Sequence, residues 1–281
     1  RGGETRGKSM SLLLCRQEPV NNPYYIEVLD IHIYSSQELC YVIFNHPLLV
    51  MEEFVDNSLL DFIRRELDLP ALAERMEKLM ETGSRPEDVL TLFLLENDYY
   101  TEKEIMQFKA AAASYRKLPA GEYEKARADY LFEKRQYGRA AARYEKVLEE
   151  LKEESREEQE AFRARIYNNL GAAYAQMFQF HKALAAYEKS YELREEKDVL
   201  KRIYFLSRFA PELEIKKIYR SQTGGEERKL WDQEADQAAL DGEQAEEVRA
   251  LRNLFKKDPV KRMNGAVSLV NRWRKEYRKM V

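Results

Sequence analysis

The chain has 281 residues, of which 44% are hydrophobic and 35% are charged, with only 11 glycines and 8 prolines. This composition is too polar for a membrane protein and too apolar for a disordered chain, and it favours long helices. The 47 basic and 50 acidic side chains leave a formal charge of -3, which gives no overall attraction to nucleic acid or to an anionic bilayer.

Cysteine usage and apolar runs point to a cytoplasmic protein. Cys15 and Cys40 lie outside any C-x-x-C spacing and cannot form a disulfide framework or a zinc site by themselves. The longest apolar runs are far shorter than the roughly 20 residues of a spanning helix, so no membrane segment is expected. Residues 1–9 are charged and Gly-rich, and we expect them to be disordered or an untranslated leader before a natural start at Met10.

The first quarter of the chain carries the strand-like segments. Residues 12–15 and the alternating segment Ile31–Ile33 contain side chains that suit a pleated surface, and Pro and Asn residues between them favour a turn. We therefore expect a short two-stranded pairing at most, within an N-terminal cap over residues 10–118.

Capping boxes mark the helix starts. In each box a hydroxyl accepts from the backbone three residues on, while a Glu reaches back to the cap. The boxes pair Ser35 with Glu38, Ser84 with Glu87, Thr101 with Glu104, Ser155 with Glu158, and Thr223 with Glu226. Asp258 before Pro259 marks one more start. In the cap, helices are expected at 36–45, 58–67, 70–81, 85–96 and 102–117.

A repeat follows the cap. Tyr167, Leu170, Gly171 and Tyr174, followed by Ala183 and Tyr187, have the spacing of two helices that cross closely at small residues. This segment strongly resembles the tetratricopeptide repeat family, with Tyr in the place usually given to Trp. A weaker copy lies 43 residues upstream, at Ala128, Ala140 and Tyr144; the usual period is about 34.

The resemblance implies a mainly α fold, a solenoid of helical hairpins. It implies two repeats over residues 119–196 and C-terminal helices over 197–281 that extend or cap the stack. The helix expected near 199–209 would bury Ile203, Phe205, Leu206 and Phe209. The N-terminal part, with Asn22-Pro23-Tyr24-Tyr25, is similar to uncharacterised tetratricopeptide proteins of anaerobic Gram-positive bacteria, and no activity follows from that similarity.

In the tetratricopeptide family the first helix of each repeat lines a concave groove that binds peptides. The resemblance places these residues in the groove: Lys125, Asp129, Phe132, Arg165, Asn168, Asn169, Ala172 and Gln176. They could hydrogen-bond an extended segment of a partner protein, or they could be solvated helix residues. A clamp for a peptide carboxylate is not expected, because Asp129, Val199 and Ile203 occupy positions where that clamp has Asn, Lys and Arg.

The C-terminal third separates its charges. Residues 226–247 contain nine acidic and two basic side chains, net -7, whereas residues 249–281 contain eleven basic and two acidic ones, net +9. We expect the two segments to pair as helices that fold back on each other. The alternative is a basic surface that contacts nucleic acid or another anionic partner. Its residues would be Arg272, Arg274, Lys275, Arg278 and Lys279. Trp273 and Tyr277 lie at helical spacing with Met263, Ala266, Val270 and Met280, and core packing is expected for them.

Nothing in the sequence predicts an enzyme. The three histidines, His32, His46 and His181, are scattered, and no metalloprotease or nucleotide-binding motif occurs. We expect no cofactor and no metal. The sequence therefore predicts a non-catalytic cytoplasmic adaptor that binds another protein, and the alternative is a regulator whose basic C-terminal helix contacts nucleic acid.

Overall fold

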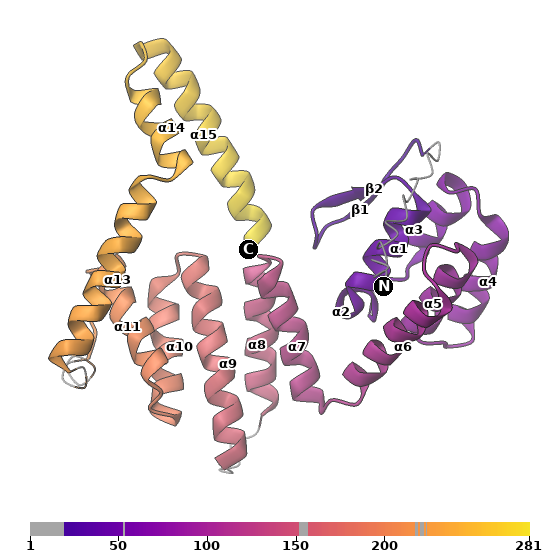
Figure 1. Ribbon diagram of the computed structural model, residues 1–281, viewed down its shortest axis with the longest axis horizontal. Coiled ribbons are helices and arrows are strands. Elements are labelled where there is room, and N and C mark those ends of the chain that lie inside the picture. Colours follow the sequence, from indigo (N-terminus) through magenta and orange to yellow (C-terminus); the bar gives the residue numbers. More distant parts are fainter. Residues whose placement is uncertain (1–19, 53, 152–156, 217–218, 220–221, 223) are drawn as a thin grey trace, which may run out of the picture. The chain divides into compact units, whose positions relative to one another are not determined.

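The computed structural model is 75% helical, with one small antiparallel sheet near the N-terminus (Figure 1). It describes residues 20–281 except 53, 152–156, 217–218, 220–221 and 223. The expected leader at 1–9 and the expected strand at 12–15 lie outside these residues. None of the described helices combines the length and apolar character needed to cross a membrane.

The chain divides into two compact units, residues 1–118 and residues 119–281. In the first unit, short helices surround an apolar core in which Leu39, Ile43, Ile63 and Phe93 are fully buried. Its elements are β1 Tyr24–Ile26, β2 Ile31–Ile33, α1 Ser36–Asn45, α2 Pro47–Val50, α3 Asn57–Asp61, the π-helical turn η1 Phe62–Glu66, α4 Pro70–Glu81, α5 Pro86–Glu96 and α6 Glu102–Arg116.

The two-stranded pairing exists, but with a different first strand. β2 forms where alternation predicted it, and its partner is β1, with Tyr24 opposite Ile33 and Ile26 opposite Ile31. A tight turn joins the two strands and places Asp30 at a positive φ of 53°, a conformation that Asp tolerates better than most residues. The local hairpin closes a much shorter loop than a pairing with residues 12–15 would, and its loop entropy cost is correspondingly smaller.

Three of the four predicted helix starts that fall within the described residues follow their capping residues. Ser35 accepts from Glu38, Thr101 and Glu104 form a reciprocal capping box, and the Asp258 side chain accepts from Lys261. Ser155 and Thr223 lie outside the described residues. The box at Ser84 is wrong, because α5 begins at Pro86, whose missing N–H suits the first helical position.

The Glu87 carboxylate has another role. It is nearly buried and accepts two hydrogen bonds from the Arg116 guanidinium, at 3.0 and 3.1 Å, which also bonds the Met51 carbonyl at 2.8 Å. Glu87 therefore ties the last turn of α6 to α5 and cannot turn back to cap its own helix.

In the second unit, α7 to α11 lie in a row, and each packs against the helix that follows it (Figure 1). Three further helices among the described residues follow the row, and we call them the C-terminal arm. The elements of the row are α7 Ala120–Glu133, α8 Tyr137–Glu150, α9 Glu157–Gln176, α10 Phe180–Leu193 and α11 Lys197–Phe209. Those of the arm are α13 Gly225–Glu243, α14 Glu246–Phe255 and α15 Pro259–Met280.

Helices α9 and α10 cross closely at Gly171. A Cβ atom at this position would lie 2.6 Å from the Tyr187 ring, nearer than side-chain atoms normally approach. Ser190 fixes the same pair by donating to the Ala164 carbonyl at 2.8 Å. In the preceding pair, α7 and α8, the small residues Ala128 and Ala140 are fully buried. Gly171 is therefore required by the distance between the helices rather than by backbone conformation.

Helix α11 packs on α10 through Val199, Ile203 and Leu206, which are all buried. The expectation that Phe209 is buried is wrong: its side chain is 65% exposed at the end of the helix. Phe205 is half-buried. Helix α11 thus has one apolar face, which packs on α10. The side chains on its other side can contact α13.

The last helix is the largest departure from expectation. No residue of α15 is buried, and Met263, Val270, Trp273 and Tyr277 are 39 to 63% exposed. Core packing was expected for this stripe, but its residues are exposed, and the helix that α15 packs against is α14, where Leu254 touches Gly265.

The C-terminal end of α15 returns to the row. Tyr277 donates to the Met177 carbonyl at 3.4 Å, and the Val281 backbone lies against Gly138 at the start of α8. The C-terminal arm therefore leaves the row beside α11. Its end returns to the row at the start of α8 and at the turn between α9 and α10.

The Gly171 crossing generates a stability prediction. Gly171→Ala should lower the free energy of unfolding by about 1 to 3 kcal/mol, because the added methyl group forces the buried Tyr187 ring to move. Gly242→Ala is the control, since an exposed helical glycine has no atom within 4 Å of its Cβ position and alanine there should stabilise by up to about 1 kcal/mol. Urea unfolding followed by circular dichroism measures both. Equal stability of Gly171→Ala and the parent chain would contradict the close crossing.

Candidate interaction surface

The residues proposed for the groove lie on helices α7 and α9. In α9, Arg165, Asn168, Ala172 and Gln176 recur every three or four residues and so share one side of the helix. Two contacts join this side to α7: Asn169 to Asp129 at 3.0 Å, and Arg165 to Glu122 at 3.3 Å. We call the surface the α7–α9 face, and it consists of Lys125, Asp129, Phe132, Arg165, Asn168, Asn169, Ala172 and Gln176.

Asp129 is the centre of this face. Its carboxylate accepts from Tyr144 at 2.5 Å and from Asn169 at 3.0 Å, and it pairs with Lys125 at 2.6 Å. Tyr144 comes from α8 and Asn169 from α9, so one side chain of α7 connects three helices. Burial, and secondly the bond to Asp129, raises the pKa of the Tyr144 hydroxyl, which therefore stays protonated and acts as a donor.

Sequence reasoning missed this network. The i to i+4 spacing of Lys125 and Asp129 was a visible signal for an ion pair. The bonds to Tyr144 and Asn169 depend on how α7, α8 and α9 pack, and nothing local in the sequence reports that. As a result, Lys125 and Asn169 are already bonded within the protein and are not both open to a ligand.

Other members of the face remain accessible. Gln176 is exposed, Arg165 has a side chain 57% exposed and stacks over Phe162, and Phe132 is half-buried against Tyr137. The Oδ1 atom of Asn168 is buried and has no hydrogen-bond partner among the described residues. A buried acceptor without a donor is unfavourable, but this atom is closed to solvent, so a donor from outside could reach it only after the Asn168 side chain turned outward.

The remaining repeat residues lie behind the face, in the packing between helices. Leu170, Tyr174, Ala183 and Tyr187 are buried. Tyr167 is half-buried, with Lys189 over its ring at 5.3 Å, and Tyr174 donates to Glu145 of α8.

The geometry gives no support to a carboxylate clamp. Lys125 is neutralised by Asp129, and Val199 and Ile203, at two of the positions where the clamp would need cations, are each about 1% exposed. A peptide carboxylate would meet the Asp129 charge before it met a free cation.

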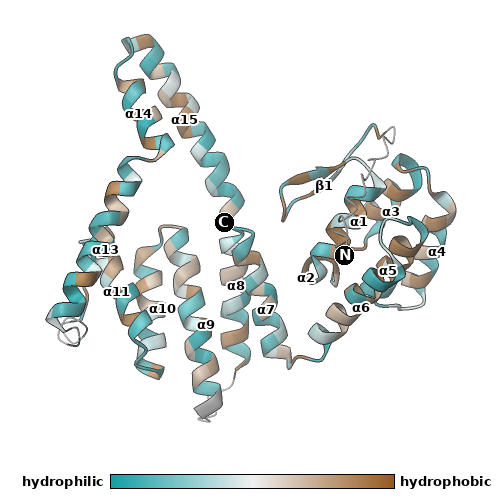
Figure 2. Cartoon of the chain, viewed as in Figure 1, coloured by the Kyte–Doolittle hydropathy of each residue, from teal (hydrophilic) through white to brown (hydrophobic). Residues whose placement is uncertain are grey.

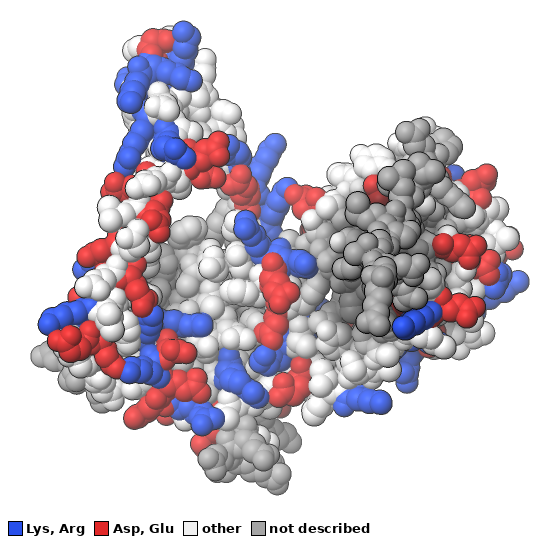
Figure 3. All heavy atoms as spheres, in the orientation of Figure 1, with Lys and Arg blue, Asp and Glu red and all other residues white. Residues whose placement is uncertain are grey.

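The expected pairing of the acidic and basic C-terminal segments is largely wrong: among the described residues one ion pair joins them, between Glu243 and Arg252 at 3.4 Å. The acids of α13 pair with α11 instead: Glu234 with Lys201 at 2.6 Å, Asp236 with Arg208 at 2.8 Å, and Glu227 with Lys197. Figure 3 shows acidic side chains along α13 and basic side chains gathered on α14 and α15. Helix α11 carries three basic side chains on the side that faces α13. These side chains lie nearer to the acids of α13 than the basic side chains of α15 do.

The basic surface lies on α15. Arg272 pairs with Glu276 of its own helix at 3.7 Å, and no ion pair joins Arg274, Lys275 or Arg278 to another described residue. Lys279 belongs to the same helix and makes other contacts. Within the described chain, this surface is therefore positive and largely uncompensated.

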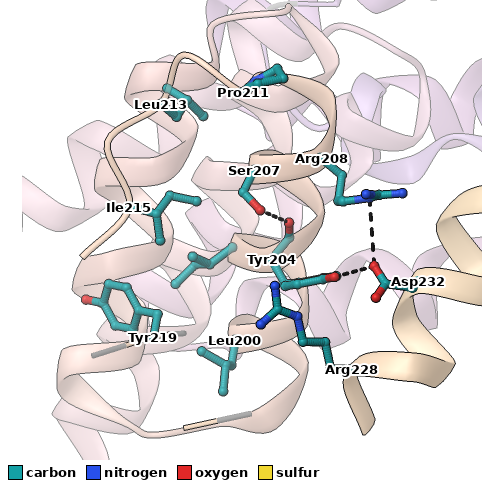
Figure 4. Close-up of a pocket in the computed structure, with 11 residues that line it drawn as sticks. Leu200, Tyr204, Ser207, Arg208, Pro211, Leu213, Ile215, Tyr219, Arg228 and Asp232 are labelled. Atoms are coloured by element: carbon teal, nitrogen blue, oxygen red, sulfur yellow. Dashed lines mark hydrogen bonds and ion pairs between the residues drawn. The ribbon is translucent and has the colours of Figure 1, made fainter. Parts of the chain in front are cut away.

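A cavity of about 390 Å³ lies between α11 and α13 (Figure 4). Tyr204 and Arg208 of α11 both point toward Asp232 of α13, and Ser207 donates to the Tyr204 carbonyl. Arg228 lies over the Tyr204 ring at 5.8 Å. Because these polar groups bond one another, the cavity is best explained as the joint between the two helices. Its lining consists of Leu200, Ile203, Tyr204, Ser207, Arg208, Pro211, Leu213, Ile215, Tyr219, Arg228 and Asp232.

Within the described residues, no cluster of three His, Cys, Asp or Glu side chains could hold a metal ion. Comparison of the chain with known protein families, curated proteins and solved structures found no match. The properties of the α7–α9 face and of α15 therefore rest on their own geometry.

The Asp129 network can be tested by a double-mutant cycle. Tyr144→Phe should lower the free energy of unfolding by about 1 kcal/mol, the value of one hydrogen bond, whereas Asp129→Ala should cost about 1 to 3 kcal/mol because it leaves the Tyr144 hydroxyl without its acceptor. In the Asp129→Ala background, Tyr144→Phe should cost nothing or restore stability. Urea unfolding of the four proteins gives the coupling, and strictly additive effects would mean that the bond contributes nothing.

Proposed function

We propose that the protein is a non-catalytic cytoplasmic scaffold that binds a segment of another protein on the α7–α9 face. The observation that carries this proposal is that α7 and α9 present side chains on one shared surface, where Arg165 and Gln176 are exposed. The order of packing from α7 to α11 and the spacing around Gly171 support a tetratricopeptide-like solenoid as its framework.

The mechanism follows from rigidity. Arg165, Asn168 and Gln176 project from a single helix whose position is fixed by Gly171 and by Asp129. A partner therefore meets side chains that are already in place, and little conformational entropy is lost on binding. A backbone group of the partner would bond the exposed Gln176 amide, and a carboxylate would pair with Arg165 better than with Lys125.

This proposal predicts a selective loss of binding. Arg165→Ala combined with Asn168→Ala should weaken the affinity for the partner at least about tenfold, or about 1.4 kcal/mol. The matched control is Lys146→Ala on α8, which removes an exposed cation with a comparable weak pair, to Glu150 at 3.7 Å. Pull-down from the native cells with quantitative mass spectrometry identifies the partner, and titration of purified proteins gives the affinity. Equal retention by the double variant and by Lys146→Ala would remove the face from the proposal.

A second candidate is a regulator in which the basic surface of α15 contacts nucleic acid or another anionic partner. The observation in its favour is that the acids of α13 are bound to α11, so that α15 keeps its charge.

If nucleic acid is that partner, the logarithm of affinity for duplex DNA should fall with the logarithm of salt concentration, with a slope of about -0.9 per phosphate contact. Changing Arg274, Lys275, Arg278 and Lys279 to Gln should then reduce the slope by up to about 4. Fluorescence titration at several salt concentrations measures it. Weak binding that the four substitutions leave unchanged would eliminate this candidate.

A further inference from the structure

An exposed apolar stripe runs along α15. Met263, Val267, Val270, Trp273 and Tyr277 follow one another at intervals of three and four residues and so share one side of the helix. Their exposed fractions are 63, 55, 40, 41 and 39%. Figure 2 shows hydrophobic segments on α15 between hydrophilic ones. The stripe spans about 21 Å at 1.5 Å per residue, or about four helical turns.

The stripe continues onto the row of helices. Tyr277, at its end, bonds the Met177 carbonyl, and the next residue in the chain, Phe178, is 71% exposed. Phe178 has a φ of 59°, the left-handed region that bulky side chains seldom adopt and that Gly or Asn would fill more easily. The Gln179 N–H bonds the Tyr174 carbonyl, so Phe178 is the left-handed C-terminal cap of α9, and Arg135 caps α7 in the same conformation. What distinguishes Phe178 is the large apolar ring that this cap displays to solvent.

The edges of the stripe are positive. Helix α15 carries seven basic side chains and one acidic one, net +6, and Arg262, Arg274 and Arg278 flank the stripe. None of these three has an ion pair with a residue that the structure describes. Of the acids of α13, Glu234 and Asp236 pair with α11, and Glu243 pairs with Arg252 of α14. An occupant of the stripe must therefore bring both apolar and acidic groups.

We propose that the α15 stripe, together with Phe178, is the docking site for an acidic amphipathic helix of a partner protein. A helix of about four turns has the length of the stripe, its apolar side would cover Val270 and Trp273, and its carboxylates would meet the flanking arginines. This surface lies apart from the α7–α9 face, so the inference goes beyond the proposed function and does not rest on it.

Two other occupants fit less well. A bilayer is flat, and the side chains best suited to its interface, Trp273 and Tyr277, are only 41 and 39% exposed at the end of the stripe, where α15 meets the α9–α10 turn. Nucleic acid would use the arginines but would leave Met263 and Val267 uncovered.

The test uses the full chain and a fluorescent peptide of about 18 residues with Leu at helical spacing and Glu elsewhere. Anisotropy should report binding at least tenfold tighter than that of a peptide with Lys in place of Glu, or of a scrambled Glu/Leu peptide. Val270→Ser with Trp273→Ser should reduce the affinity at least tenfold, and Arg274→Gln with Arg278→Gln should reduce both the affinity and its dependence on salt. Met106→Ser, which changes an equally exposed side chain in the first unit, should have no effect.

Phe178→Asn separates a binding role from a structural one. The substitution suits the backbone conformation, so the midpoint of thermal unfolding should stay the same or rise while peptide affinity falls several-fold. Any of four results would overturn the proposal: no preference for the Glu peptide, unchanged affinity of the stripe variants, stripe-dependent binding of phosphatidylserine vesicles or duplex DNA without peptide binding, or a dimer in sedimentation that Trp273→Ser dissociates.

Discussion

The Tyr187 ring lies against the backbone of Gly171, and the positions of the neighbouring helices follow from that contact. The crossing brings α9 and α10 close enough for Ser190 to bond the Ala164 carbonyl. Arg202 of α11 then lies over the outer side of the same ring, at 6.0 Å. One aromatic side chain thus spaces three successive helices, and a shift of this ring would be transmitted to both neighbours because the packing leaves no room to absorb it.

Ion pairs determine how the helices after α10 are arranged in the second unit. Helix α11 has apolar residues on the side toward α10 and basic residues on the side toward α13. Those exposed ion pairs contribute little stability individually, but they determine which segment lies beside α11. Their second effect concerns α15, which receives no ion pair from these acids of α13 and presents its arginines and its apolar stripe together.

The sequence predicted the features whose causes are local. Ser35, Thr101 and Asp258 cap their helices because the required groups lie within three residues, and the alternation at Ile31–Ile33 gives a strand. The capping box predicted at Ser84 does not form, because the Glu87 carboxylate is bonded to Arg116, which lies 29 residues away in sequence.

The sequence could not predict which partner a segment finds. Periodicity shows that Trp273 and Tyr277 share a side of α15, but it does not show whether another helix covers that side. The opposite charges of segments 226–247 and 249–281 suggested that these segments pair. Instead, acids of α13 pair with a third segment, α11. For the α7–α9 face, residue types indicated possible hydrogen bonding, whereas the Asp129 network depends on three helices meeting.

The return of α15 to the row closes the second unit into a loop of helices. Tyr277 and Met177 are 100 residues apart in sequence, while the row itself is built from contacts between neighbours, so this closure costs the most chain entropy for the fewest contacts. It should form last in folding and open first in the native state. Amide hydrogen exchange would then be fast in α15 and slow in α9, and the space beside the stripe would open and shut while the row stays folded.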